Sequence, residues 1–194
     1  MPGDNVMGAG NQQERLDASW VVGFVDGEGC FHIGINRQPR MKMGWQVLPE
    51  FRVVQHRRDI NVLRVMQSFF DCGSVVVNNG DRMELRVRGL DNLKKVVEFF
   101  ERNPLRTKKR NDFRKFAQAV RIIDRGQHLT AAGLREVAIL ASEMNRRRNE
   151  SASRILRDYT PNIRMDEDIV RPSWRHEEAT RNRVPPPGDR RSQK

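Results

Sequence analysis

Residues 20–33, WVVGFVDGEGCFHI, join an apolar, helix-like segment directly to an Asp-Gly-Glu-Gly run and then to a strand-like alternation. Leu16, Trp20 and Phe24 recur every four residues, which predicts a helix over about residues 16–26 and places Trp20 and Phe24 in the core. Glycine weakens a helix, and the carbonyl groups at a helix C-terminus repel carboxylates. A helix that ends in this way therefore needs a compensating role.

A second face of this helix carries only small side chains. Ser19, Gly23 and Gly27 share the four-residue spacing, so another backbone can approach closely along them. If the partner is the same face of a second copy, two helix ends lie side by side, each carrying Asp26 and Glu28. Carboxylates brought together repel unless a cation lies between them, and hard divalent ions such as Mg²⁺ take oxygen ligands. The pattern predicts a metal-binding helix end at a homodimer interface formed by the small face.

The following residues alternate between strand and helix patterns. Strand patterns occur at residues 30–36, 45–55, 74–78 and 82–88, and helical patterns are indicated near 59–73, 91–104, 113–126 and 130–144. Pro49 interrupts the second strand pattern and indicates an edge position or a bulge, because proline cannot donate to a ladder. Four antiparallel strands with helices on one face predict an α+β sandwich whose other face is open and polar.

The charge of the chain indicates an anionic partner. The 194 residues include 36 Lys and Arg against 25 Asp and Glu, a formal net charge of +11, with a pI near 10.7. Such a balance favours nucleic acid or an anionic membrane surface as partner. No apolar run approaches the roughly 20 residues that a membrane span needs. An open sheet face rich in arginine is the expected contact surface for the anion.

The two ends of the chain differ in composition from its middle. We expect residues 1–14 to be a flexible leader, residues 15–148 to form the domain, and residues 149–194 to be a basic, partly disordered extension. The start of the chain lacks the pattern of a secretory signal. We therefore expect a protein of the prokaryotic cytoplasm or of an organellar matrix rather than a secreted one.

The segment WVVGFVDGEG resembles the LAGLIDADG motif, a helix that ends in acid-Gly-acid-Gly. The strand–strand–helix–strand–strand order after it also matches that family of homing endonucleases, and the likeness covers about residues 16–147. One copy of the motif is visible, so the chain resembles the single-motif members, which act as homodimers. The resemblance implies an αββαββα sandwich whose dimer forms a DNA-binding saddle and cuts both strands of a long, pseudo-palindromic target.

The resemblance also assigns roles to individual residues. Glu28 is expected to bind the catalytic metal, Mg²⁺, with the Gly27 carbonyl as a second contact. Mn²⁺ is expected to substitute for Mg²⁺, and Ca²⁺ to support DNA binding alone. Gln55 is expected to position the active-site water, and Lys109 to lie near the scissile phosphate, with Lys108 as the alternative. The implied reaction is phosphodiester hydrolysis by metal-activated water.

Two positions depart from the family pattern. Glu28 stands where Asp is usual and is longer by one methylene. Some members carry an Arg four residues after the glutamine; here Asp59 stands at that place and is interpreted as a helix cap, which leaves Arg57 or Arg58 to supply the charge. Asp26, the other motif acid, is expected to brace the helix end.

The strand residues on the open face are the predicted readers of base sequence. A two-stranded ribbon fits the DNA major groove, where Arg pairs with guanine, Asn and Gln with adenine, and Glu with cytosine. The loop after the first strand is expected to contact phosphates through its cations. The predicted DNA-binding residues are His32, Asn36, Arg37, Arg40, Lys42, Gln46, Glu50, Arg52, Asn78, Arg82, Glu84, Arg86 and Arg88, with Arg37, Arg40 and Lys42 assigned to phosphates.

Two alternative functions stay open beside the endonuclease. An RNA-splicing maturase can use the same fold to hold its host intron RNA, and a noncatalytic DNA-binding regulator can be built on it. The acid retained at Glu28 argues against the regulator. The sequence does not separate the endonuclease from the maturase.

Overall fold

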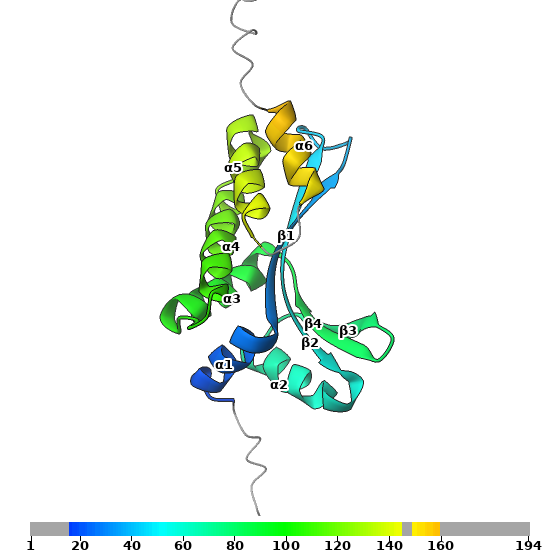
Figure 1. Cartoon of the computed structure of the whole chain (residues 1–194), viewed down its shortest axis with the longest axis vertical. Helices are drawn as coiled ribbons and strands as arrows, with labels where there is room; N and C mark the ends of the chain where they lie inside the picture. Colours follow the sequence, from blue (N-terminus) through cyan, green and yellow to red (C-terminus); the bar gives the residue numbers. More distant parts are fainter. Residues whose placement is uncertain (1–15, 145–148, 160–194) are drawn as a thin grey trace, which may run out of the picture. The chain divides into compact units, whose positions relative to one another are not determined.

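A four-stranded antiparallel sheet is the frame of the structure, a computed structural model that describes residues 16–144 and 149–159 (Figure 1). The strand order is β1–β2–β4–β3. In chain order the elements are α1 (Ala18–Glu28), β1 (Gly29–Arg37), β2 (Trp45–His56), a 3-10 turn (Arg57–Asp59), α2 (Ile60–Phe70), β3 (Ser74–Asn79), β4 (Arg82–Val87), α3 (Leu90–Arg102), α4 (Lys109–Asp124), a second 3-10 turn (Gln127–Leu129), α5 (Ala131–Ser142) and α6 (Glu150–Asp158).

The helices pack on one face of this sheet, as predicted for an α+β sandwich. Figure 1 shows α3, α4 and α5 along one side of β1 and β2. Phe31 of β1 and Phe51 of β2 point into this layer, and the Phe31 ring contacts Phe100 of α3 and Phe116 of α4 with centroid separations of 5.6 and 5.3 Å. These rings are at most 1% exposed. One continuous aromatic core therefore joins the sheet to the helices, and the predicted αββαββα order is confirmed.

Pro49 lies in β2, a central strand of the sheet, and the pairing register explains how a proline is accommodated there. β1 pairs with β2 from Arg37↔Trp45 to Gly29↔Val53, including Ile33↔Pro49. β4 pairs with β2 only from Phe51 onward. Pro49 therefore has a neighbouring strand on one side alone, and the predicted edge position is confirmed.

Helix α1 buries a different face from the one predicted. Val21 and Val25 are fully buried, whereas Trp20 is 42% exposed and stacks on Phe24 with ring centroids 4.7 Å apart. The prediction of a core position is wrong for Trp20, whereas Phe24 is half-buried and packs against the edge of the core. Two adjacent stripes share the four-residue spacing, and the valine stripe is the one that faces the sheet and the other helices.

Helix caps follow the predictions only in part. Thr130 caps α5 by accepting a hydrogen bond from the Gly133 amide, as expected. Asp59 makes no side-chain cap bond to α2; instead the His56 imidazole Nδ1 accepts from the Arg58 amide at 3.1 Å. The prediction that Asp59 caps its helix is therefore wrong. A 3-10 turn lies between β2 and α2, and the side-chain cap is made at the start of this turn by His56, the last residue of β2.

The packed unit extends beyond the boundary predicted at residue 148. Ala152 and Ile155 of α6 are fully buried, and α6 lies against α5 and β1. The expected leader, residues 1–14, and residues 160–194 of the expected extension lie outside the described residues. Among the helices that the structure describes, none is both long and apolar enough to cross a membrane.

Asp26 ties the end of α1 to the segment that leads into α4. Its carboxylate accepts from the Arg106 amide at 2.8 Å, from the Thr107 amide at 3.2 Å and from the Thr107 hydroxyl at 2.7 Å. Burial alone would raise the pKa of Asp26, but these hydrogen bonds and the charge of Lys109 lower it below its ordinary value. The expected brace is present, and its partner is the α3–α4 connection.

We predict that Asp26→Asn lowers the free energy of unfolding at pH 7 by about 1–2 kcal/mol, because an amide places a donor among donors. The wild-type advantage is complete above the ordinary aspartate pKa and disappears as the pH falls through the lower folded-state pKa. Urea unfolding from pH 7 to pH 2 measures this. Asp91→Asn, at an exposed carboxylate, is the control. Equal stability of the Asp26 variant and wild type at pH 7 would contradict the prediction.

Candidate functional site

Glu28 is the last residue of α1, and its side chain is exposed where the helix meets β1. The next residue must be glycine. A Cβ on Gly29 would lie 2.5 Å from Val25 Cγ1 and 2.8 Å from the Val25 carbonyl oxygen. The Gly29 amide instead bonds that carbonyl and closes the helix. The motif therefore turns sharply from helix to strand and leaves the Glu28 carboxylate at the surface.

Lys109, the first residue of α4, reaches the same helix end. Its ammonium donates to the Val25 carbonyl at 2.8 Å and to the Gly27 carbonyl at 3.2 Å. A cation at a helix C-terminus is favourable because the last carbonyls carry partial negative charge. Burial lowers the pKa of the Lys109 ammonium, while Cys30, Asp26 and Glu28 act in the opposite direction. The structure thus brings Lys109 of α4 to the last turn of α1, which carries the Gly27 carbonyl and Glu28.

The other residues with a predicted part in catalysis lie on β2, on the 3-10 turn that follows it and just before α4. Gln55 lies near the end of β2, paired in register with Met83 of β4 and half-buried. Lys108 precedes α4 and is exposed. Arg57 and Arg58 lie in the 3-10 turn, where Arg57 is within 4.0 Å of Asp81. The roles of these residues stay predictions.

The donor set at the α1 terminus has the chemistry of a hard-cation site but is incomplete in one copy. Glu28 offers a carboxylate and Gly27 a carbonyl oxygen, both of which suit Mg²⁺ or Ca²⁺. Within residues 16–144 and 149–159, no group of three or more His, Cys, Asp or Glu side chains could hold a metal ion. A metal ion held by Glu28 and the Gly27 carbonyl would therefore need further oxygen ligands.

The small face of α1 is open to solvent. Ser19, Gly23 and Gly27 are exposed, and a Cβ built on Gly23 or Gly27 would meet nothing within 4 Å. An adjoining hollow of about 720 Å³ is lined by Ser19, Gly23 and Asp26 together with residues of the α3–α4 connection. The face therefore has room for a second backbone, as the predicted homodimer interface requires.

The sheet face opposite the helices is polar. His32, Gln46, Arg52 and Arg86 are half-buried there. Burial and the neighbouring Arg52 lower the pKa of the His32 imidazole, against the opposing effect of Glu50. The exposed members of the predicted DNA-binding set are Asn36, Arg37, Arg40, Lys42, Asn78, Arg82 and Arg88.

Two members of that set, Glu50 and Glu84, are buried. Glu50 is 7% exposed, and its carboxylate holds Arg52 at 3.3 Å and Arg88 at 2.7 Å. Glu84 is fully buried, is ion-paired with Arg86, and accepts from the Asn78 amide at 2.7 Å. Their oxygens are used within the protein, which differs from the predicted role of reading cytosine.

The register explains why these carboxylates are needed. Arg52 of β2 lies directly opposite Arg86 of β4, and two like charges in that position destabilise a sheet. Glu50 and Glu84 each neutralise one of the two arginines. The long arginine side chains in turn cover the two carboxylates. Glu50 and Glu84 therefore lie on the outer face of the sheet, as the alternating strand pattern predicts, and are nevertheless buried.

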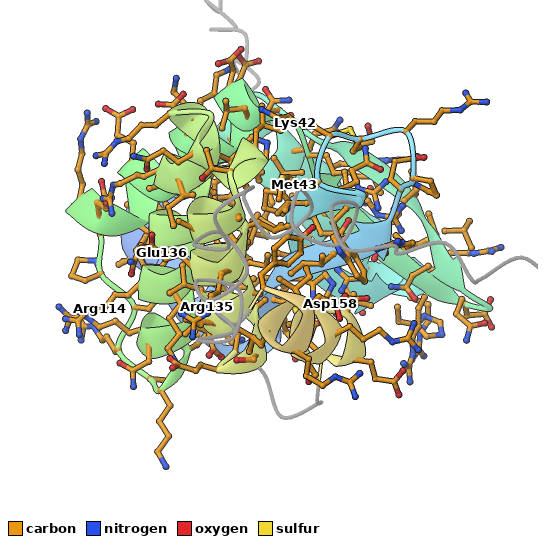
Figure 2. All side chains as sticks on the ribbon, turned by 90° about the horizontal axis from the view of Figure 1, so that it is seen from above. Lys42, Met43, Arg114, Arg135, Glu136 and Asp158 are labelled. Carbon is orange, nitrogen blue, oxygen red and sulfur yellow. The ribbon has the colours of Figure 1, made fainter. Side chains whose placement is uncertain are left out.

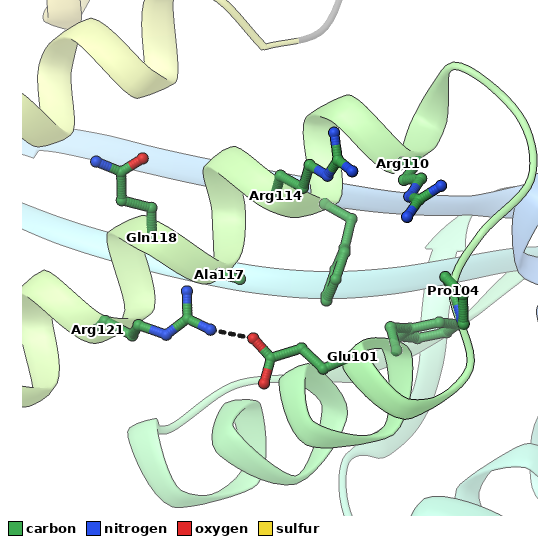
Figure 3. Close-up of a pocket in the computed structure, with 9 residues that line it drawn as sticks. Glu101, Pro104, Arg110, Arg114, Ala117, Gln118 and Arg121 are labelled. Atoms are coloured by element: carbon green, nitrogen blue, oxygen red, sulfur yellow. Dashed lines mark hydrogen bonds and ion pairs between the residues drawn. The ribbon is translucent and has the colours of Figure 1, made fainter.

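A separate depression lies between α3 and α4 (Figure 3). Its volume is about 400 Å³, and its rim includes Arg110, Arg114 and Arg121, the last of which is ion-paired with Glu101. None of the predicted site residues lines it.

Comparison with known proteins identifies the family. A family model described as LAGLIDADG endonuclease matches residues 21–120. A Neurospora crassa protein named probable intron-encoded endonuclease 3 is 31% identical over 162 residues, covering 80% of this chain and 30% of that protein. The chain thus spans about a third of the length of that relative.

Solved structures give the same result. The homing endonuclease I-TnaI is 53% identical, with a TM-score of 0.72 over 75% of this chain and 99% of that chain. I-SmaMI bound to an uncleaved DNA target in the presence of calcium ions is 27% identical, with a TM-score of 0.71 over 75% of this chain and 51% of that chain. The helix ending in DGEG, the sheet order and these matches agree, and the chain belongs to the LAGLIDADG endonuclease family.

Proposed function

We propose that two copies of this chain form a homing endonuclease that makes double-strand breaks in DNA by Mg²⁺-dependent phosphodiester hydrolysis. The observation that carries the proposal is the α1 terminus, where the Lys109 ammonium of α4 is hydrogen-bonded to the last turn of α1, next to an exposed Glu28 carboxylate and an open, small-residue face. A turn that served only to reverse the chain would need neither the half-buried Lys109 nor the bare helix face.

The lengths of the structural relatives support assembly from two copies. The match covers 99% of the I-TnaI chain but only 51% of the I-SmaMI chain. This is the ratio expected if a longer chain holds two such units while a shorter one pairs with a copy of itself. Pairing along Ser19, Gly23 and Gly27 places two Glu28 side chains near one axis, which supplies the missing carboxylate.

Glu28 and the Gly27 carbonyl are the residues that would hold the metal ion. When bound, Mg²⁺ would lower the pKa of water and stabilise charge on the phosphate oxygens. Lys109 holds the carbonyls at the α1 terminus in place and keeps a positive charge beside the carboxylate. Gln55, half-buried at the end of β2, supplies an amide that can orient a water molecule.

The polar face of the sheet supports DNA as the partner. Arg52, Arg86 and Arg88 are fixed by buried carboxylates, so their guanidinium groups are oriented before a ligand arrives. Ordering these long side chains in advance reduces the entropy lost on binding. The face is therefore suited to reading guanine in the major groove through Arg52, Arg86 and Arg88.

We predict that Glu28→Gln lowers the rate of DNA cleavage about a hundredfold or more, because a neutral amide binds Mg²⁺ poorly. Cut sites are first selected from a randomised duplex library with wild-type protein and Mg²⁺. DNA binding in Ca²⁺ should change little. Glu98→Gln, which removes the same charge from an exposed site on α3, is the control. Wild-type protein that cuts no member of the library would end the endonuclease proposal.

We predict that Gly23→Leu weakens dimerisation without unfolding the chain, because Gly23 is exposed and a Cβ there meets nothing within 4 Å in one copy, while a leucine side chain blocks close helix pairing. Sedimentation velocity should show monomers at concentrations where wild type is dimeric. Ser68→Leu, at an exposed site on α2, should sediment as wild type. A Gly23→Leu chain that remains dimeric would place the interface elsewhere.

We predict that Glu84→Gln reduces discrimination between the selected target and unrelated DNA about tenfold, because Arg86 and Asn78 lose their fixed partner. Affinity for unrelated DNA should rise slightly, since a negative charge leaves a basic face. Dissociation constants in Ca²⁺ at one salt concentration measure both quantities, with Asp81→Asn on the same hairpin as the control. A loss confined to one C·G position, with binding to unrelated DNA unchanged, would instead make Glu84 a base reader.

A further inference from the structure

The end of α6 is hydrogen-bonded to the loop that joins β1 to β2. The Tyr159 hydroxyl donates to the Met43 carbonyl at 3.0 Å, across 116 residues of sequence. Both residues are partly buried and pack against the hydrophobic core. Figure 2 looks onto this end of the molecule, with Lys42 and Met43 marked in the loop and Asp158 at the end of α6.

Helix α6 is packed firmly into the core of the domain. Its residues Ala152 and Ile155 are fully buried. Asn149 caps its first turn, because its side-chain Oδ1 accepts a hydrogen bond from the Ala152 backbone amide at 3.0 Å. The side-chain Nδ2 of Asn149 donates to the Ile33 carbonyl of β1 at 3.4 Å. The helix is therefore joined to the sheet at its start and to the loop at its end.

The β1–β2 loop is closed by backbone hydrogen bonds of its own, and its basic side chains are exposed. The Gln38 amide bonds the Gly44 carbonyl at 2.9 Å, and the Gly44 amide bonds the Met41 carbonyl at 2.8 Å. Arg40 and Lys42 are exposed on it. Beyond its two strand ends, the bond from Tyr159 is a third attachment, on the arm that returns to β2.

We propose that Tyr159 is a positioning residue for DNA recognition, which holds the β1–β2 loop so that Arg40 and Lys42 meet the phosphate backbone. The inference rests on the proposed function. The whole of β1, whose nine residues span roughly 27 Å of extended chain, lies between Glu28 and the loop. Tyr159 thus acts on binding at the flanks of the target and not on hydrolysis beside Glu28.

The physical reason is the entropy of ordering the loop. A loop that is held in its bound position loses little conformational freedom when DNA arrives, whereas a loose loop must be ordered at that moment. Removing the hydroxyl also leaves the Met43 carbonyl, in a partly buried place, without its donor. Binding of the target should therefore weaken, while the rate of the chemical step in the bound complex stays the same.

The test is Tyr159→Phe, which keeps the ring and removes the hydrogen bond. We expect the dissociation constant for the selected target in Ca²⁺ to rise about three- to tenfold, the usual effect of one hydrogen bond. The single-turnover cleavage rate in Mg²⁺ at saturating protein should be unchanged. Ser153→Ala removes a hydrogen bond to the Asn149 carbonyl within the same helix, away from the loop, and should leave both quantities unchanged.

A second variant separates positioning from general stability. If Tyr159 acts through the loop cations, then Lys42→Ala and Tyr159→Phe together weaken binding by less than the product of their separate effects. The inference would be overturned if the two substitutions weakened binding by the full product of their separate effects, or if Tyr159→Phe bound the target as tightly as wild type. If the wild-type protein still cleaves its target, either of these results leaves the proposed function intact. A wild-type chain that neither binds nor cuts DNA would overturn both.

Discussion

The end of α1 and the start of α4 hold each other in place, and the candidate site depends on this mutual attachment. Asp26 of α1 accepts the amides of Arg106 and Thr107 ahead of α4, while Lys109 of α4 donates to the last carbonyls of α1. Each helix end thus receives the charge that its own dipole favours. Glu28, one residue beyond these contacts, is left at the surface on a rigid support.

The same principle organises the sheet face. Charges that would destabilise the fold alone are arranged in pairs, so that Glu50 and Glu84 hold the arginines above them in fixed positions. A buried ion pair adds little net stability, because desolvation offsets the attraction, but it restricts geometry. The protein therefore gives up little stability to present guanidinium groups in defined orientations, which is what sequence recognition requires.

The sequence predicted the fold and the α1 terminus because both follow from short periodic patterns and one local motif. It did not predict which stripe of α1 is buried, because the Trp20 and Val21 stripes have the same period. It placed Glu84 on the outer face correctly but not its burial, since alternation does not show that arginines cover it. The contact of Tyr159 with Met43 joins residues 116 apart and leaves no local pattern.

We propose that one copy carries half of a site and that two copies complete it on one DNA duplex. Native mass spectrometry of the protein with its selected target in Ca²⁺ distinguishes this arrangement from cleavage by a single chain. We expect one dominant complex that contains two chains and one duplex, and that cuts both strands when Mg²⁺ replaces Ca²⁺. A complex of one chain and one duplex that goes on to cut both strands would contradict it.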